Sequence, residues 1–339
     1  MKPIHGLALL LASTASFAAS EVTLYGRVLG GVQNVNAAAR AERAYFSGDV
    51  GAVNGSTEVN DLYSRWGIKG EEALPDGMKA FFQIESGIGI DAADASFYVG
   101  KNSFASREGW LGLGGDFGSI KLGRGKTPYT QAAEFYDNFI GTHTFGSANF
   151  GTGYYGLGSN YRSNNTVWYS TPKLGNLQGD VAYFTGENKN AAGLNSRGVS
   201  LRLVGNWDAF DSHVGYQKAK DYEAVKGADL EQWVAGGSYY LGRLNLGAQH
   251  SQNKLRLGTT RQKVKASTLF GSYAFDDMGT AFRLGYVRQT AGADKADVFN
   301  IGGQYNFSKR TYALAEYYAK RVNNGPDPAI LTVGLGHDF

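Results

Sequence analysis

Apolar and polar side chains alternate along most of the chain. In MKAFFQIESG, residues 78–87, apolar side chains stand at every second position, and Phe81 is an apolar exception on the polar face. The closing residues, LTVGLGHDF, keep one face of an extended strand apolar as far as Phe339. A period of two is typical of strands with one face in apolar surroundings. We therefore predict an all-β fold, because no apolar stripe with the period of a helix runs for a useful length.

About sixteen such segments follow one another along the chain. Their predicted bounds are 22–35, 63–73, 78–88, 104–115, 118–127, 165–174, 177–186, 198–208, 210–221, 231–242, 243–255, 262–275, 279–290, 296–307, 310–321 and 329–339. A tilted strand needs roughly 9–11 residues to cross a bilayer, so every segment is long enough to span one.

Short and long connections alternate between these segments. The short ones, rich in Gly, Asn and Asp, are 74–77, 114–118, 173–176, 207–210, 276–279 and 306–309. The longer, more polar ones are 37–61, 90–103, 128–164, 186–197, 221–231 and 322–328. Antiparallel strands with tight turns at one rim and longer loops at the other are typical of a transmembrane β-barrel.

The composition agrees with a barrel and excludes several other classes. The 339 residues include 48 Gly and 21 Tyr but no Cys, and only 19% are charged. Glycine weakens helices by roughly 1 kcal/mol each, whereas tyrosine favours strands. Without cysteine there is no disulfide and no thiolate metal site. After residue 20 no apolar run approaches the ~18 residues of a membrane-spanning helix.

The first twenty residues have the pattern of a secretory signal peptide. A basic start at Lys2 precedes an apolar run and then small residues up to Ser20. Cleavage after Ala18 or Ser20 fits this pattern, and we favour Ser20, which leaves 21–339 as the barrel domain. A single membrane anchor is the alternative, but the apolar run is short for one. The formal net charge of +3 for the whole chain indicates no nucleic-acid partner.

Several motifs, taken together and in order, resemble those of general porins of the beta-proteobacterial, neisserial type. They are VTLYG at 22–26, SRWGIKGEE at 64–72, KAFFQIE at 79–85, FGSIKLGR at 117–124, and the terminal Phe339. The resemblance covers essentially all of 21–339. It implies a barrel of sixteen strands in the outer membrane of a Gram-negative bacterium, surrounded by lipid and assembled as a homotrimer. Such a porin passes ions and small hydrophilic solutes by diffusion, and its terminal Phe is read by the barrel-assembly machinery.

The long segment 128–164 is the third long loop, which in porins folds inward and narrows the channel. The family pattern opposes acidic loop residues, here Glu134 and Asp137, to basic residues of the wall. The candidate wall residues are Arg27, Arg65, Lys79, Arg107, Lys121 and Arg124. Charged side chains in mid-strand are expected to face inward, because at the lipid-facing midplane they cost about 2–4 kcal/mol. Lys121 and Arg124 differ in parity, so both face the lumen only if a bulge or the end of the strand intervenes near Gly123.

We predict a weak anion preference, because basic candidates outnumber acidic ones and the family commonly shows it. Glu71, Glu72 and Glu85 would cancel part of this preference. Two other classes remain open: an outer-membrane barrel hydrolase and a secreted β-rich adhesin.

We predict no enzyme activity, no metal and no cofactor. The histidines outside the predicted leader, at 143, 213, 250 and 337, lie far apart in sequence. GRGKT at 123–127 fails as a phosphate loop, because Ile120 stands where the first glycine is needed.

Overall fold

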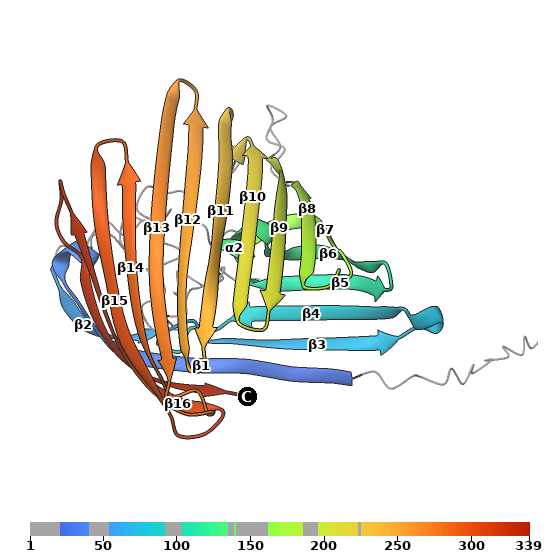
Figure 1. The fold of residues 1–339 in the computed structure, drawn as a ribbon, viewed down its shortest axis with the longest axis horizontal. Helices are drawn as coiled ribbons and strands as arrows, with labels where there is room; N and C mark the ends of the chain where they lie inside the picture. The colour runs from blue at the N-terminus through green and yellow to red at the C-terminus, as the bar shows by residue number, and fades with distance from the viewer. Residues whose placement is uncertain are drawn as a thin grey trace, which may run out of the picture.

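The computed structural model describes residues 21–40, 54–91, 104–134, 139, 162–185, 196–222 and 225–339. These residues form one antiparallel sheet and little helix (Figure 1). The strands are β1 (Glu21–Val35), β2 (Ser56–Asp61), β3 (Arg65–Ala73), β4 (Lys79–Gly87), β5 (Glu108–Gly115), β6 (Gly118–Lys126), β7 (Arg162–Ser170), β8 (Leu177–Thr185), β9 (Arg197–Trp207), β10 (Phe210–Lys220), β11 (Ala228–Leu241), β12 (Leu244–Leu257), β13 (Thr260–Ala274), β14 (Ala281–Ala291), β15 (Asp294–Asn306), β16 (Thr311–Val322) and β17 (Ala329–Asp338). The helices are η1 (Pro75–Gly77) and α2 (Pro128–Ala133).

The 17 strand segments form the sixteen wall strands that the sequence predicts, because β2 and β3 are halves of one strand. Both pair with β1: β2 lies opposite 30–35 and β3 opposite 21–27. The break falls at Tyr63, which has φ 75°. The Asp61 carboxylate accepts hydrogen bonds from the backbone N–H groups of Tyr63 and Ser64 at 3.0 and 3.2 Å, and so satisfies the interrupted backbone.

The barrel closes between the first and last strands. β17 pairs with β1 in the register Arg27 to Asp338 through Val35 to Ile330. Beyond that ladder, Phe339 and Gly26 exchange two backbone hydrogen bonds of 3.0 Å. A Cβ on Gly26 would lie 2.3 Å from the Phe339 ring, so only glycine leaves room for it. The terminal residue is therefore part of the closed wall.

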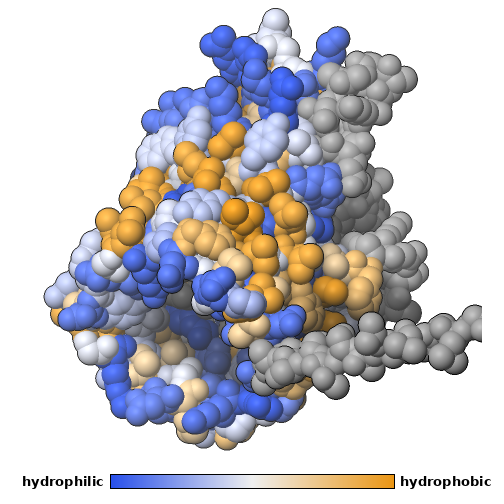
Figure 2. All heavy atoms as spheres, turned by 90° about the vertical axis from the view of Figure 1, so that its right-hand side faces the viewer, coloured by the Kyte–Doolittle hydropathy of each residue, from blue (hydrophilic) through white to orange (hydrophobic). Residues whose placement is uncertain are grey.

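The alternation predicted for the last strand is confirmed. Leu331, Val333 and Leu335 are 48, 55 and 60% exposed on the outer face, whereas the side chains between them are buried. Figure 2 shows hydrophobic side chains gathered across the outer wall between more hydrophilic ends. Among the described residues no helix is long and apolar enough to cross a membrane.

Several strands are longer at the loop end than predicted. β2 lies inside the predicted loop 37–61, and β11 begins within the predicted loop 221–231. β12 and β13 are joined by a tight turn with Gly258 at φ 60°. The sequence of β2, STEVND, holds one hydrophobic residue and therefore shows no apolar alternation. Its pairing with β1 could not be predicted from such a pattern.

The chain that follows β6 enters the barrel. Helix α2 lies against the inner side of β9, β10 and β11 (Figure 1). Tyr129 fixes it there, donating from its backbone N–H to Ser200 Oγ at 2.8 Å and from its hydroxyl to Asn253 Oδ1 at 2.9 Å. Gly215 leaves space for the helix, since a Cβ there would lie 2.8 Å from Ala132 Cβ. Farther on, buried Phe139 lies beside Gly285 of β14.

The described start of the third long loop therefore runs along the inside of the wall, as the sequence predicted. The remainder of segment 128–161, Asp137 included, lies outside the described residues.

Candidate pore site

Arginines of β1, β3 and β7, together with Arg107 just before β5, face the lumen near the loop end of the strands. We call Arg27, Arg65, Arg107 and Arg162, with their carboxylate partners, the arginine tier. Arg27 binds Asp338 across the closure with two bonds, Nε to Oδ1 at 2.6 Å and Nη2 to Oδ2 at 3.1 Å. Arg27 and Arg65 are direct partners in the β1–β3 register, so the pairing of these two neighbouring strands brings their positive charges together.

Glu85 is shared by two of these arginines. Its Oε1 accepts from Arg107 Nε at 2.6 Å, and its Oε2 lies 3.7 Å from Arg65 Nε. The Tyr25 hydroxyl also donates to Glu85 Oε2 at 3.1 Å. The Glu85 and Arg107 side chains are only 9 and 11% exposed. This carboxylate therefore offsets much of the repulsion between neighbouring guanidiniums.

Glu108 has a similar role on the next strand. Its Oε1 lies 3.4 Å from Arg162 Nε, and its Oε2 accepts from Trp110 Nε1 at 2.7 Å. Glu134, predicted from the sequence as a constriction acid, follows α2 and forms an ion pair with Lys126. It lies inside the barrel, and its side chain is 13% exposed.

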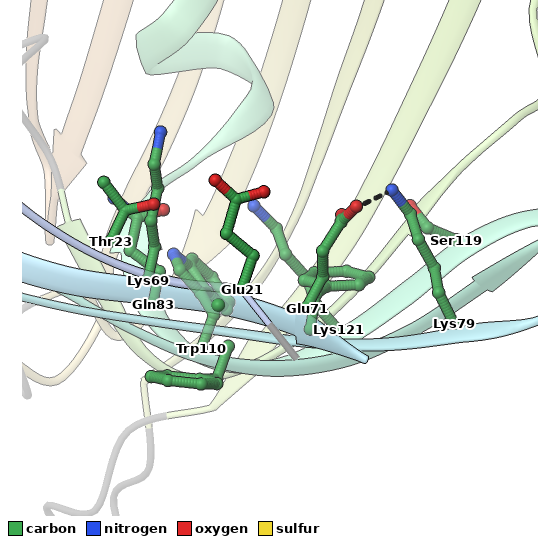
Figure 3. Close-up of a pocket in the computed structure, with 12 residues that line it drawn as sticks. Glu21, Thr23, Lys69, Glu71, Lys79, Gln83, Trp110, Ser119 and Lys121 are labelled. Atoms are coloured by element: carbon green, nitrogen blue, oxygen red, sulfur yellow. Dashed lines mark hydrogen bonds and ion pairs between the residues drawn. The ribbon is translucent and has the colours of Figure 1, made fainter. Parts of the chain in front are cut away.

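Three lysines face the lumen nearer the tight-turn end of β3, β4 and β6. We call Lys69, Lys79 and Lys121 the lysine tier (Figure 3). Lys79 Nζ binds Glu71 Oε2 at 2.8 Å. Lys121 Nζ lies 4.3 Å from the ring centroids of both Trp110 and Trp168. Lys69 Nζ lies 5.5 Å from the ring centroid of Tyr25.

Arg124 is placed differently from the other wall candidates. It pairs with Gly109 and continues the outward row of Ile120 and Leu122. The predicted bulge is present, since the β6–β7 register shifts between Gly123 and Gly125 and Gly123 has φ 144°. The Arg124 guanidinium donates to the Ser106 carbonyl at 3.0 Å and contacts Asn164 at the loop end of the strands.

The sequence reasoning missed several charged residues that face the lumen. Arg162 stood inside the predicted loop, although it opens β7. Lys69 shares the parity of Arg65 on β3, which was a usable signal. Arg202 binds Asp180 at 2.8 Å, and Arg283 donates to Gln304 Oε1 at 3.0 Å. Their mid-strand positions were the available signal, because charge is costly on the lipid face.

No group of three or more His, Cys, Asp or Glu side chains suited to a metal ion occurs within the described ranges.

The closed sixteen-strand wall, with its charged lumen and inward loop, defines an outer-membrane barrel of the porin type. The profile of the Gram-negative porin family matches residues 6–325, and the chain belongs to that family. The predicted resemblance, fold and outer-membrane location are thereby confirmed.

Individual relatives agree with this assignment. Outer membrane porin protein 32 of Delftia acidovorans is 30% identical, over 100% of this chain and 99% of that protein. Major outer membrane protein P.IB of Neisseria meningitidis is 26% identical, with 98% of each chain covered. Among solved structures, an anion-selective porin from Comamonas acidovorans superposes with a TM-score of 0.77 and 24% identity, covering 95% of this chain and 100% of that one.

Proposed function

We propose that this protein is a general diffusion porin, a water-filled channel for ions and small hydrophilic solutes. The observation that carries the proposal is the polar lumen of the closed barrel, with α2 held against its inner wall by Ser200 and Asn253. Helix α2 lies on β9–β11, whereas the arginine tier lies on β1 and β3–β7. Solutes would pass between the loop and the basic wall.

The channel has a weak preference for anions in this proposal. Bases outnumber carboxylates in the two tiers, and Glu134 and Asp137 stand as the opposing acids of the loop. A field across the pore would orient polar solutes, as charged rings do in other channels. The structurally similar porin from Comamonas acidovorans is anion-selective, which supports the same sign. Arg27, Arg65, Lys79, Arg107 and Lys121 would supply the positive side.

The proposal extends to assembly. The protein forms a homotrimer in the lipid of the outer membrane, in line with the trimer form described for a structural neighbour from Vibrio cholerae. Phe339, with its outward apolar row, is the signal for the barrel-assembly machinery. Residues 1–20 are removed as a leader, and the first strand begins directly after them at Glu21.

No catalytic step is part of this function. His250 Nδ1 lies 2.8 Å from Ser267 Oγ, but both belong to a row of the outer face. His213 contacts Gln249 inside the barrel, and His337 contacts Thr311 on another strand pair. A hydrolase site needs a base, a nucleophile and an orienting group that converge beside substrate.

Conductance across a planar lipid bilayer tests the proposal. The purified protein should produce stepwise increases in current, and in a KCl gradient the reversal potential should have the sign of chloride preference. Material that is folded by its resistance to mild SDS yet carries no current would overturn the channel function. Current with the sign of potassium preference would overturn only the selectivity.

A further inference from the structure

A hollow of about 630 Å³ opens on the lumen side of β1 and β3–β6, at the level of the lysine tier. Lys69, Lys79, Lys121, Glu21, Phe81 and Gln83 are among its lining residues. It lies below the arginine tier, toward the tight-turn end, because the Glu21–Glu71 pair is six residues along each strand from the Arg27–Arg65 pair. Figure 3 shows the side chains of Lys69, Glu21 and Lys121 on the same side of the sheet.

Two ammonium groups of this hollow are held by aromatic rings. Lys121 Nζ sits 4.3 Å from two indole centroids, and each indole is fixed by its own N–H. Trp110 donates to Glu108 at 2.7 Å, and Trp168 donates to Ser170 Oγ at 2.9 Å. The face of an aromatic ring attracts a cation but offers no conventional hydrogen-bond acceptor to most of the N–H groups of that cation. The Lys121 ammonium therefore remains a hydrogen-bond donor toward the lumen.

Lys69 is held in a comparable way over the Tyr25 ring. The Tyr25 hydroxyl is fixed by hydrogen bonds with Gln83 and Glu85 at 2.8 and 3.1 Å. Among the described residues, neither Lys69 nor Lys121 has a carboxylate oxygen within the 4.0 Å of an ion pair. Lys79 is engaged by Glu71, and Glu21 is the remaining acid of the hollow. Positive charge therefore exceeds negative charge where a solute would bind.

The hollow also contains an aromatic platform. Phe81 interrupts the polar lumen face of β4 and is half-buried. Its ring lies on Gly112 of the adjacent strand, where a Cβ would be 2.3 Å from the ring. One ring face thus rests on the backbone. An aromatic face at the edge of a polar, water-filled hollow is suited to stacking against a planar solute.

We propose that this hollow is a binding subsite for small aromatic carboxylates. The carboxylate group binds the Lys121 ammonium, with Lys69 adding to the positive charge of the hollow, and the ring stacks on Phe81, which rests on Gly112, the β5 partner of Lys121. Thr23, Gln83 and Ser119 line the hollow beside them and offer further hydrogen bonds. This inference rests on the proposed porin function, since the solute must enter through the channel.

Block of the chloride current by added solutes tests the subsite. Benzoate, acetate and benzamide are added in turn on the tight-turn side of the wild-type protein in a planar bilayer. Benzoate should reduce the current in a saturable way, with a half-blocking concentration about tenfold below that of acetate or benzamide, as expected when one good interaction is gained. Equal half-blocking concentrations for benzoate and acetate would overturn the subsite and leave the porin function standing. A protein that conducts no current at all would overturn both.

Two variants separate the charge from the ring. Lys121→Gln should raise the half-blocking concentrations of benzoate and acetate together, by about tenfold for the loss of a charge-assisted hydrogen bond. Phe81→Leu should raise that of benzoate alone and bring it toward the acetate value. Block by benzoate that neither variant changes would overturn the assignment.

Matched controls are available on the same chain. Lys309→Gln lies in the exposed turn between β15 and β16, and Phe299→Leu lies on the outer face of β15. Both should leave block by benzoate unchanged. Resistance to mild SDS establishes that each variant is folded before its current is measured.

Discussion

The arginine and lysine tiers lie on the same stretch of wall but hold their positive charges differently. Each arginine of the upper tier lies near a carboxylate, and Glu85 lies against two of them. The planar guanidinium matches the geometry of a carboxylate and retains its charge when partly buried. In the lower tier only Lys79 has such a partner within the described parts of the chain, while Lys69 and Lys121 lie over aromatic rings.

The difference separates two tasks of a charged pore wall. In the arginine tier the ion pairs fix side chains from β1, β3, β4, β5, β7 and β17 and so stiffen the wall opposite the loop. In the lysine tier the aromatic rings position charge without neutralising it. We expect changes in the first tier to affect stability as well as selectivity, and changes in the second to affect mainly selectivity.

The largest effect is expected from a change that prevents barrel closure, which brings Arg27 and Asp338 together. Deletion of Phe339 removes two backbone hydrogen bonds to Gly26 and the end of the outward apolar row. Assembly should slow, and unfolded protein should accumulate in the periplasm, as measured by cell fractionation and heat-dependent migration on a gel. Normal amounts of folded barrel in the membrane would remove Phe339 from the assembly signal.

The next largest effect is expected from Glu85→Gln. It leaves Arg65 and Arg107 without their shared carboxylate, and charged hydrogen bonds of this kind contribute about 2 kcal/mol. The temperature at which the folded form converts to the unfolded form, as seen by migration on a gel, should fall. The reversal potential should move toward the value for anion preference. Glu72→Gln is the control, because Glu72 is exposed in the outward register of β3. An equal fall in both variants would show that the ion pairs of the arginine tier do not stabilise the wall.

Lys121→Glu should have the largest effect on selectivity in the lysine tier. The substitution changes the wall by two charge units, and each unit shifts the anion and the cation in opposite directions by about 0.5 kcal/mol at about 8 Å in water, an energy that salt at about 0.1 M roughly halves. The anion-to-cation permeability ratio should therefore fall by about fivefold. Lys309→Glu, in an exposed turn, should change it much less. An unchanged reversal potential in Lys121→Glu would place Lys121 outside the conducting path.

The smallest effect is expected from Lys69→Gln. It removes one charge and breaks no ion pair, so the permeability ratio should fall by about twofold. The temperature of gel conversion should stay at its wild-type value, in contrast to Glu85→Gln. A loss of stability as large as that of Glu85→Gln would show that the cation–ring contact is a structural bond and would erase the distinction between the tiers.

The strands could be predicted from the sequence because one physical rule applies at every position of the wall. A side chain points either toward lipid or toward the lumen, so alternation alone assigned the outward faces of β4 and β17. The rule weakens where the strands extend beyond the apolar band. Ser56–Asp61 and Ala228–Leu230 were consequently assigned to loops, although backbone pairing extends them as strands.

The ion-pair and ring partners of the charged residues could not be predicted from the sequence in the same way. Arg27 and Asp338 are 311 positions apart, and they meet only because the last strand pairs with the first. Arg107 and Glu85 are 22 positions apart and depend on the register of β4 with β5. The rings that hold Lys121 come from β5 and β7, on either side of its own strand.

By itself the sequence determined the barrel, its number of strands and the apolar outward faces of clearly alternating strands, because these follow from local alternation and from the need to pair every backbone group in a membrane. Only the tertiary structure decided which basic side chains are neutralised by a carboxylate and which lie over aromatic rings and keep their charge. That outcome depends on inter-strand register, on the bulge after Gly123 and on closure, which set distances between residues far apart in the chain. Coulomb and ring interactions depend on those distances and not on order along the chain.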